Sequence, residues 1–329
     1  MLDYIFSFAF WASILRMATP IVFSSMAAII GDQANVLCIG YEGIMLFAAL
    51  GGALGSAFSQ SLLVGALCGV AAGMLLAAFF AYFVLYLDTK PLLAGLGINT
   101  LGSGVTIYAI YLLTGMKLNT SALPSLQFPD IHIPILEDIP VLGPLLSGHN
   151  LMVYFAFIAT ACVWFLLLKT KLGLRIRAVG KDPNAATSMG INVKKTKFIA
   201  LLFSGILASF GGLYMSMGYM NYFSADMVAG RGFLGIAAQR LGVSNPGLVL
   251  LVTIVFGAAT AFGIMAQTLP SVNMPSQFAS MTPHLATLIG LAIMGEVAIR
   301  NRRKKISDIR GKALAEKAAS SAQNRRDLR

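Results

Sequence analysis

Charged residues are scarce in this sequence. Only 11% of its 329 residues are Asp, Glu, Lys or Arg, whereas 57% are hydrophobic. This balance excludes an ordinary soluble domain and is typical of a polytopic membrane protein. Because a bilayer span needs about 20 apolar residues, we expect an all-α membrane helix bundle of about eight to ten transmembrane helices. The charge-free runs that predict it are 60–87, 91–116, 150–168, 198–225 and 241–295, the last with room for two spans.

Cysteine and histidine are also rare, with three of each. The cysteines fall in apolar segments without the spacing of a metal or redox site, and the histidines are scattered along the chain. The sequence contains no GxxxxGK[ST] phosphate-binding loop. We therefore expect no metal site, no cofactor bound by this chain and no ATP-driven or enzymatic activity of its own.

The basic residues that are present concentrate in two segments. Residues 169–197 hold eight Lys or Arg against one acid, and residues 300–329 hold eleven against three. Lys and Arg accumulate on the cytoplasmic side of membrane proteins, so we expect both segments to be cytoplasmic and the more acidic loop 115–149 to be external. This arrangement predicts a transmembrane domain over residues 1–299 followed by a basic cytoplasmic tail, and it gives no reason to expect nucleic acid as a partner.

Two hydrophobic segments are interrupted by glycine. Two cytoplasmic segments must be joined by an even number of membrane crossings. The apolar runs between the basic segment and the tail supply three, so residues 225–246 must cross once more, although this segment carries Arg231 and Arg240. In the N-terminal half, Gly40 and Gly43 flank Glu42 within the stretch GDQANVLCIGYEGIMLFAALGG. Glycine-interrupted segments in both halves indicate broken or re-entrant helices that line a binding site.

Five polar residues within the apolar segments are candidates for the translocation path: Glu42, Asn99, Asn221, Arg231 and Gln239. An ionisable or amide side chain inside a membrane must face protein or water, and the amides are suited to a ribose or a base. Each has a second interpretation. Glu42 can equally form an interhelical hydrogen bond that fixes the broken segment, the amides can join helices, and Arg231 can anchor the re-entrant segment.

A short helix is predicted inside the basic segment 169–197. Asp182 followed by Pro183 is a good N-cap and first helical residue, and Gly190 suits the position after the end of a helix. The spacing predicts a helix over residues 183–189, which is too short to be stable without a surface to pack against. The alternative is an ordinary cytoplasmic loop with a solvated turn.

The stretch GLRIRAVGKDPNAATSMGINVKKTKFIALLFSGILASFGGLYMS resembles the cytoplasmic coupling region of permease subunits of bacterial ABC importers. The similar branch moves simple sugars and nucleosides with a lipoprotein-type, basic membrane protein-associated binding protein. The resemblance continues in IIGDQANVLCIGYEGIMLFAALGG and in GRGFLGIAAQRLGVSNPGLVLLVTIVFG, and thus covers most of the chain. It implies that the coupling helix and its flanks dock on a separate ATPase; the residues concerned are Arg177, Gly180, Asp182, Pro183, Ala185, Ala186 and Gly190.

The resemblance also implies partners and a location. These are ATPase subunits that carry ATP and Mg, a second permease copy or paralogue, an external solute-binding protein, and the lipid of the bacterial inner membrane. The sequence departs from the family pattern at Asp32, Gln33, Asn35 and Cys38. The resemblance implies a nucleoside or a simple sugar as the solute. Because these departures fall beside the expected substrate path, riboflavin or another ribityl or furanosyl compound is the alternative. The other classes are an ion-coupled secondary transporter and, least favoured, a membrane enzyme.

Overall fold

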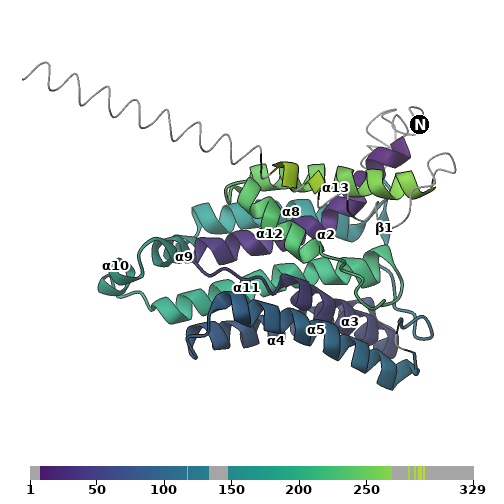
Figure 1. Ribbon diagram of the computed structural model, residues 1–329, viewed down its shortest axis with the longest axis horizontal. Helices are drawn as coiled ribbons and strands as arrows, with labels where there is room; N and C mark the ends of the chain where they lie inside the picture. Colours follow the sequence, from purple (N-terminus) through teal and green to yellow (C-terminus); the bar gives the residue numbers. More distant parts are fainter. Residues whose placement is uncertain are drawn as a thin grey trace, which may run out of the picture. The chain divides into compact units, whose positions relative to one another are not determined.

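The computed structural model describes residues 8–116, 118–132 and 147–268, together with isolated positions between residues 281 and 292. Two compact units are present, residues 1–284 and 285–329, and almost all of the description concerns the first. Its helices are α2 (Phe8–Gln33), α3 (Tyr41–Ser59), α4 (Leu62–Leu85), α5 (Pro91–Thr114), α8 (Leu151–Lys169), α9 (Lys171–Lys181), α10 (Pro183–Ser188), α11 (Val193–Leu213), α12 (Arg231–Leu241) and α13 (Pro246–Thr268) (Figure 1). A π-helical segment, η1 (Tyr214–Tyr219), continues α11.

The expected all-α membrane bundle is confirmed. Seven helices within the described residues are long and apolar enough to cross a membrane: α2, α3, α4, α5, α8, α11 with η1, and α13. Residues 269–280, within the apolar run 241–295, and the basic tail 300–329 lie outside the described residues.

Helix α2 forms the centre of this unit. Of its most apolar window 89% is buried, compared with 28% for α4 and 22% for α5, which lie on the outside. Helices α8, α11, α12 and α13 all pack against α2. Helices α3 and α5 cross at glycines, because a Cβ atom on Gly102 would lie 2.6 Å from the Cα of Gly43. The apolar side chains of α2 thus hold its four neighbouring helices together from within, and the glycines allow α3 and α5 to approach closely.

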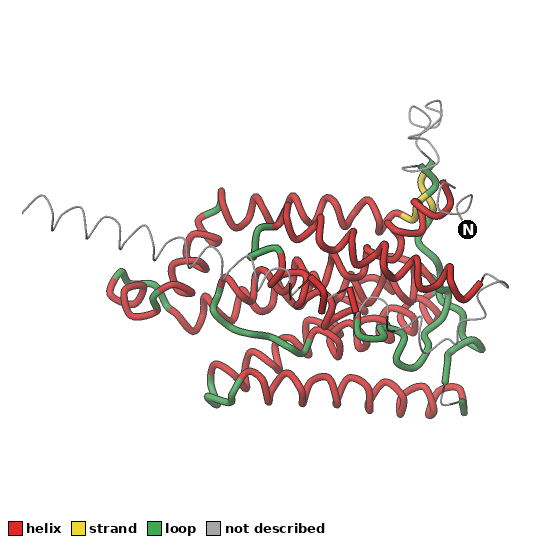
Figure 2. The backbone as a smooth tube through the Cα atoms, turned by 45° about the horizontal axis from the view of Figure 1, so that its top comes forward, coloured by secondary structure: helices red, strands yellow, loops and turns green. Residues whose placement is uncertain are grey.

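The long helices run between two ends that we name the α10 end and the strand end. At the strand end, β1 (Asp130–Ile131) pairs antiparallel with β2 (His149–Asn150). Figure 1 labels β1 there, and Figure 2 shows the strands in yellow. Residues 118–128 run beside the chain that follows η1 there. The N–H of Thr120 donates to the carbonyl of Phe223 (2.9 Å), and the N–H of Ser125 donates to the carbonyl of Asn221 (2.7 Å).

Both predicted broken segments are present. Helix α2 ends at the α10 end, and the non-helical residues 34–40 lead back into the bundle before α3 begins (Figure 1). In the second half, non-helical residues 220–230 enter from the strand end, and the 11-residue α12 completes the passage to the α10 end. Residues 225–246 thus run from the strand end to the α10 end as a loop and a short helix.

Candidate coupling and translocation sites

Helix α10 has a hydrogen-bonded cap at each end. The Oδ1 atom of Asp182 accepts hydrogen bonds from the N–H groups of Asn184 (2.9 Å) and Ala185 (3.1 Å). After the helix, Gly190 has a φ of +76°, which favours glycine. The N–H of Gly190 donates to the carbonyl of Thr187, and that of Ile191 to the carbonyl of Ala186. These bonds satisfy groups that a short helix leaves free at its ends, and the predicted helix is present as Pro183–Ser188.

An open groove of about 480 Å³ lies between α9 and α10. Most of its lining is apolar, and Met189 is 82% exposed although it is a large apolar residue. An exposed apolar surface of this kind is a candidate for contact with another protein or with lipid. The groove residues are Lys171, Leu174, Arg175, Ala178, Asp182, Ala185, Ala186, Met189 and Ile191.

The predicted coupling residues do not all face this groove. Asp182, Ala185 and Ala186 line it. Gly180 instead lies against the end of α2, where an added Cβ atom would overlap the carbonyl oxygen of Gln33. Arg177 lines a different pocket, of about 230 Å³, which it shares with Gln33. The structure thus divides the motif into a groove face and a face that packs on the bundle.

Glu42 joins the two broken segments. Its Oε1 accepts a hydrogen bond from the N–H of Gly230 (2.7 Å), and its Oε2 accepts one from the N–H of Gly232 (2.8 Å). Glu42 is only 7% exposed. A carboxylate placed on the first N–H groups of α12 satisfies donors that have no partner within the helix and opposes the positive end of its dipole. This is the interhelical hydrogen bond that the sequence offers as the alternative to a path role.

Asn99 and Arg231 also stabilise the breaks. The Oδ1 of Asn99 accepts from the N–H of Gly43 (2.9 Å), and its Nδ2 donates to the carbonyl of Ile39 (3.0 Å), so that α5 supports the start of α3. The Nη1 of Arg231 donates to the carbonyls of Met227 (3.2 Å) and Val228 (3.0 Å), in the turn before α12. Arg231 therefore anchors the segment on which it lies.

Gln239 belongs to a polar network at the α10 end. Its Nε2 donates to the hydroxyl of Ser244 (2.6 Å), which donates in turn to Oδ2 of Asp32 (2.6 Å). Arg240 lies 3.2 Å from the other carboxylate oxygen of Asp32. The network ties the end of α2 to the end of α12. Asp32 was not among the predicted site residues; its position beside a chain break is the sequence signal that identifies it.

Asn221 differs from the other four candidates, because it is exposed at the strand end. Its backbone carbonyl accepts the N–H of Ser125. The translocation role of all five residues stays a prediction. Four of them have side-chain hydrogen bonds within the bundle that account for their position without a solute.

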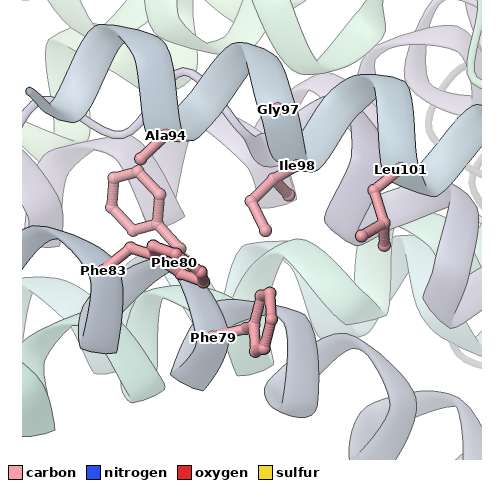
Figure 3. A pocket seen from close by; sticks show the side chains of 7 residues that line it. All are labelled: Phe79, Phe80, Phe83, Ala94, Gly97, Ile98 and Leu101. Atoms are coloured by element: carbon pink, nitrogen blue, oxygen red, sulfur yellow. The ribbon is translucent and has the colours of Figure 1, made fainter. Parts of the chain in front are cut away.

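The exposed face of α5 is a further candidate surface, which the sequence prediction did not include. Gly97 and Gly104 have open space where a side chain would be, and Thr100 is exposed between them. A pocket of about 220 Å³ between α4 and α5 lies beside this face, and Figure 3 shows the side chains of Phe79 and Phe83 facing α5 across it. Its lining carries no polar side chain, so it is unsuited to a polar solute.

No metal centre is formed by the described residues, which contain no group of three or more His, Cys, Asp and Glu side chains placed to hold an ion. The three cysteines are unpaired, with Cys38 buried and the other two exposed.

Comparison with known proteins gives consistent results. The model of a family described as branched-chain amino acid transport system / permease component matches residues 10–294. The chain is 32% identical to the guanosine ABC transporter permease protein NupQ of Bacillus subtilis, over 84% of this chain and 89% of the relative. It is 28% identical to the nucleoside ABC transporter permease protein NupC of Lactococcus lactis, over 92% and 96% of the two chains. The putative glucose ABC transporter permease protein TsgC13 of Haloferax volcanii is also 28% identical, over 89% and 92%.

A solved structure, PsaBC from Streptococcus pneumoniae in complex with Fab, matches with a TM-score of 0.51. The match covers 88% of this chain and 93% of that one at 15% identity, which is a likeness of fold alone.

Proposed function

This chain belongs to the family of permease components described for branched-chain amino acid transport systems, and on that premise we propose that it forms the translocation path of an ABC importer for a nucleoside or a simple sugar. The observation that carries the proposal is the groove beside α10. A helix of six residues with both ends capped, next to an exposed apolar surface, fits a part of the molecule that another protein holds.

The partner at this groove is a separate ATPase subunit that binds ATP and Mg. The apolar residues Leu174 and Met189 are 61% and 82% exposed, and basic residues such as Lys171 and Arg175 line the same groove. This surface is suited to apolar side chains of a partner with acidic groups at the rim. The chain itself lacks the GxxxxGK[ST] loop that holds nucleotide phosphates, which agrees with a division between permease and ATPase.

A displacement of α10 has a direct route into the bundle. Helix α9 meets α10 at Asp182, which ends one helix and begins the other. Gly180 of α9 touches the carbonyl of Gln33 at the end of α2, and Asp32 next to it holds α12 through Arg240. Binding and release of ATP by the partner thereby shift the bundle between outward-open and inward-open states.

The solute passes along the exposed face of α5, between this chain and a second permease copy or paralogue. Helix α5 is the least buried of the seven long helices, yet its exposed face includes Gly97, Thr100 and Gly104. Small residues on an exposed helix face let a second helix approach closely, and the Thr100 hydroxyl is itself bonded to the carbonyl of Leu96 (3.1 Å). The first broken segment lies directly behind this face, because Asn99 of α5 holds the start of α3, and Glu42 links it to the second broken segment.

Nucleosides are the favoured solutes because two of the three relatives above are described as nucleoside or guanosine permeases, and a simple sugar follows from the third. None of these descriptions favours riboflavin or an ion-coupled mechanism.

An external binding protein delivers the solute. We propose that the chain lies in the bacterial inner membrane, with loop 169–197 and tail 300–329 in the cytoplasm and loop 115–149 outside.

The test of ATPase docking is co-purification of the tagged chain from its native membrane in mild detergent. We expect a stoichiometric partner that carries a GxxxxGK[ST] sequence. Ala185→Arg places a long cation in the groove and abolishes this association. Asn184→Arg introduces the same cation one residue away, on an exposed position that does not line the groove, and should retain the association. An active complex without an ATPase, or equal loss in both variants, contradicts the proposal.

Uptake of labelled solute in vesicles that contain the whole complex identifies the cargo. Unlabelled guanosine or uridine is expected to compete, with glucose as the second candidate. Competition by riboflavin alone overturns the nucleoside assignment while leaving the permease role intact.

A further inference from the structure

The pocket that contains Arg177 has one polar and one apolar wall. Its volume is about 230 Å³. The polar wall comes from α9, the end of α2 and the loop before α13, and the apolar wall comes from the last turns of α8. The polar lining residues are Gln33, Arg177, Ser244 and Asn245, and the apolar ones include Trp164, Leu167 and Leu168.

Arg177 brings an uncompensated positive charge to this pocket. Its Nε atom is buried and has no hydrogen-bond partner among the residues that the structure describes. The nearby acid Asp32 is already paired with Arg240 at 3.2 Å and accepts the hydroxyl of Ser244 at 2.6 Å. The residue as a whole is half-buried, and the planar N–H groups of a guanidinium match carboxylate and phosphate oxygens. The pocket is therefore suited to an anion.

A helix N-terminus strengthens this preference. Asn245 and Pro246 belong to the pocket lining, and they begin the 23-residue α13. Asn245 caps that helix, because its Oδ1 accepts the N–H of Gly247 (3.1 Å). The positive end of the helix dipole thus lies beside Arg177, and both favour negative charge.

The apolar wall places the pocket at the level of lipid headgroups. Trp164 and Leu168 are 46% and 48% exposed on α8, whose most apolar window is only 39% buried. Trp164 lies five residues before the end of α8 at Lys169, which is about 7.5 Å along the helix axis. Tryptophan followed by basic residues at the end of a transmembrane helix is typical of the membrane interface.

We propose that this pocket binds the phosphate of an anionic phospholipid, with Arg177 on the phosphate and one acyl chain along Trp164 and Leu168. Its volume of 230 Å³ is below the roughly 300–1,000 Å³ of pockets for drug-sized ligands, which suits a headgroup better than a nucleotide. Basic pockets between helices on the cytoplasmic side bind anionic headgroups in other membrane proteins. The inference depends on the membrane placement of α8 and not on the identity of the transported solute.

Tryptophan fluorescence tests the proposal directly, because the sequence contains only two tryptophans, Trp11 and Trp164. In the full chain with Trp11→Phe, all of the tryptophan emission comes from the proposed pocket. The protein is reconstituted in phosphatidylcholine that contains a small fraction of phosphatidylglycerol with brominated acyl chains, and bromine quenches a tryptophan that it contacts. Brominated phosphatidylcholine at the same fraction measures non-specific contact.

We expect brominated phosphatidylglycerol to quench more strongly than brominated phosphatidylcholine. Arg177→Gln should reduce this preference roughly fivefold, the effect of one basic residue near an anionic membrane surface. Arg175→Gln removes the same charge two residues away, outside the pocket lining, and should retain the preference. Gln33→Glu provides a second variant if Arg177→Gln fails to fold. It adds a carboxylate to the polar wall and should likewise reduce the preference for brominated phosphatidylglycerol.

Two results overturn the proposal. Equal quenching by the two brominated lipids means that the pocket does not select an anionic headgroup. Displacement of phosphatidylglycerol by millimolar inorganic phosphate, seen as lost quenching in the parent protein but not in Arg177→Gln, identifies a site for a free anion and not for lipid.

Discussion

The Oε2 atom of Glu42 lies 2.8 Å from the backbone nitrogen of Gly232, although 190 positions separate the two residues in the chain. Glu42 is the second residue of α3 and Gly232 is the second residue of α12. The carboxylate therefore joins the first turns of the two helices that follow the chain breaks. The contact is close because Gly232 has no side chain; an added Cβ atom would lie 2.6 Å from the backbone nitrogen of Glu42. The charge in the middle of the bundle is thus part of its architecture.

Glu42→Gln is expected to destabilise the bundle. The amide that this change introduces retains one acceptor for two N–H donors and turns its own N–H groups toward the other donor. Loss of one hydrogen bond to a charged group costs about 2 kcal/mol. Thermal unfolding in detergent measures the effect. Asp226→Asn is the control, since Asp226 is exposed on the loop before α12 and should change stability by less than about 0.5 kcal/mol. Unchanged unfolding in Glu42→Gln contradicts the anchoring role.

Gly180→Val is expected to reduce transport without preventing membrane insertion. The larger side chain would overlap the carbonyl of Gln33 and move α9 away from α2, at a cost of about 1–3 kcal/mol for overpacking. Solute uptake normalised to the amount of inserted protein should fall, while ATP hydrolysis by the complex becomes independent of the solute. Gly247→Ala serves as control, because the nearest atom to its added Cβ is Asn245 Oδ1 at 3.6 Å, an ordinary contact. Solute-dependent hydrolysis in Gly180→Val would show that this contact does not couple the two parts.

Local signals in the sequence explain which parts were predictable. The spans follow from long apolar runs, and the ends of α10 follow from Asp182 and Gly190, because caps depend on residues only a few positions apart. The breaks were expected from glycine and isolated charge. The partners of Glu42 and Asn99 were not, because hydrogen bonds between residues 56 or 190 positions apart depend on how helices pack. For the same reason, the motif containing Arg177 and Gly180 gave no indication that these residues face away from the groove.

Asp182→Ala is expected to weaken docking of the ATPase without affecting the fold of the bundle. The change removes acceptors for the N–H groups of Asn184 and Ala185, and the loss of such a cap costs about 1 kcal/mol. The ordered form of α10 becomes roughly fivefold less populated relative to the frayed one, and the affinity for the ATPase should fall by a similar factor. Hydrogen exchange of the α10 amides and a binding titration measure the two effects. Asp182→Ser retains a cap and should restore both; failure of Ser to do so would assign the loss to the carboxylate charge.

Gly104→Leu distinguishes a solute-facing α5 from a lipid-facing one. No atom lies within 4 Å of the Cβ position on Gly104, so the larger side chain fits within this chain and the thermal stability of the isolated subunit should be unchanged. If the face borders the path or the second permease, the new side chain obstructs it, and a barrier higher by about 1.4 kcal/mol or more slows uptake tenfold or more. Ala71→Leu makes a similar increase on the exposed face of α4 and should leave uptake unaffected, because lipid accommodates an added apolar side chain. Equal uptake in the two variants would place α5 against lipid and move the path elsewhere in the bundle.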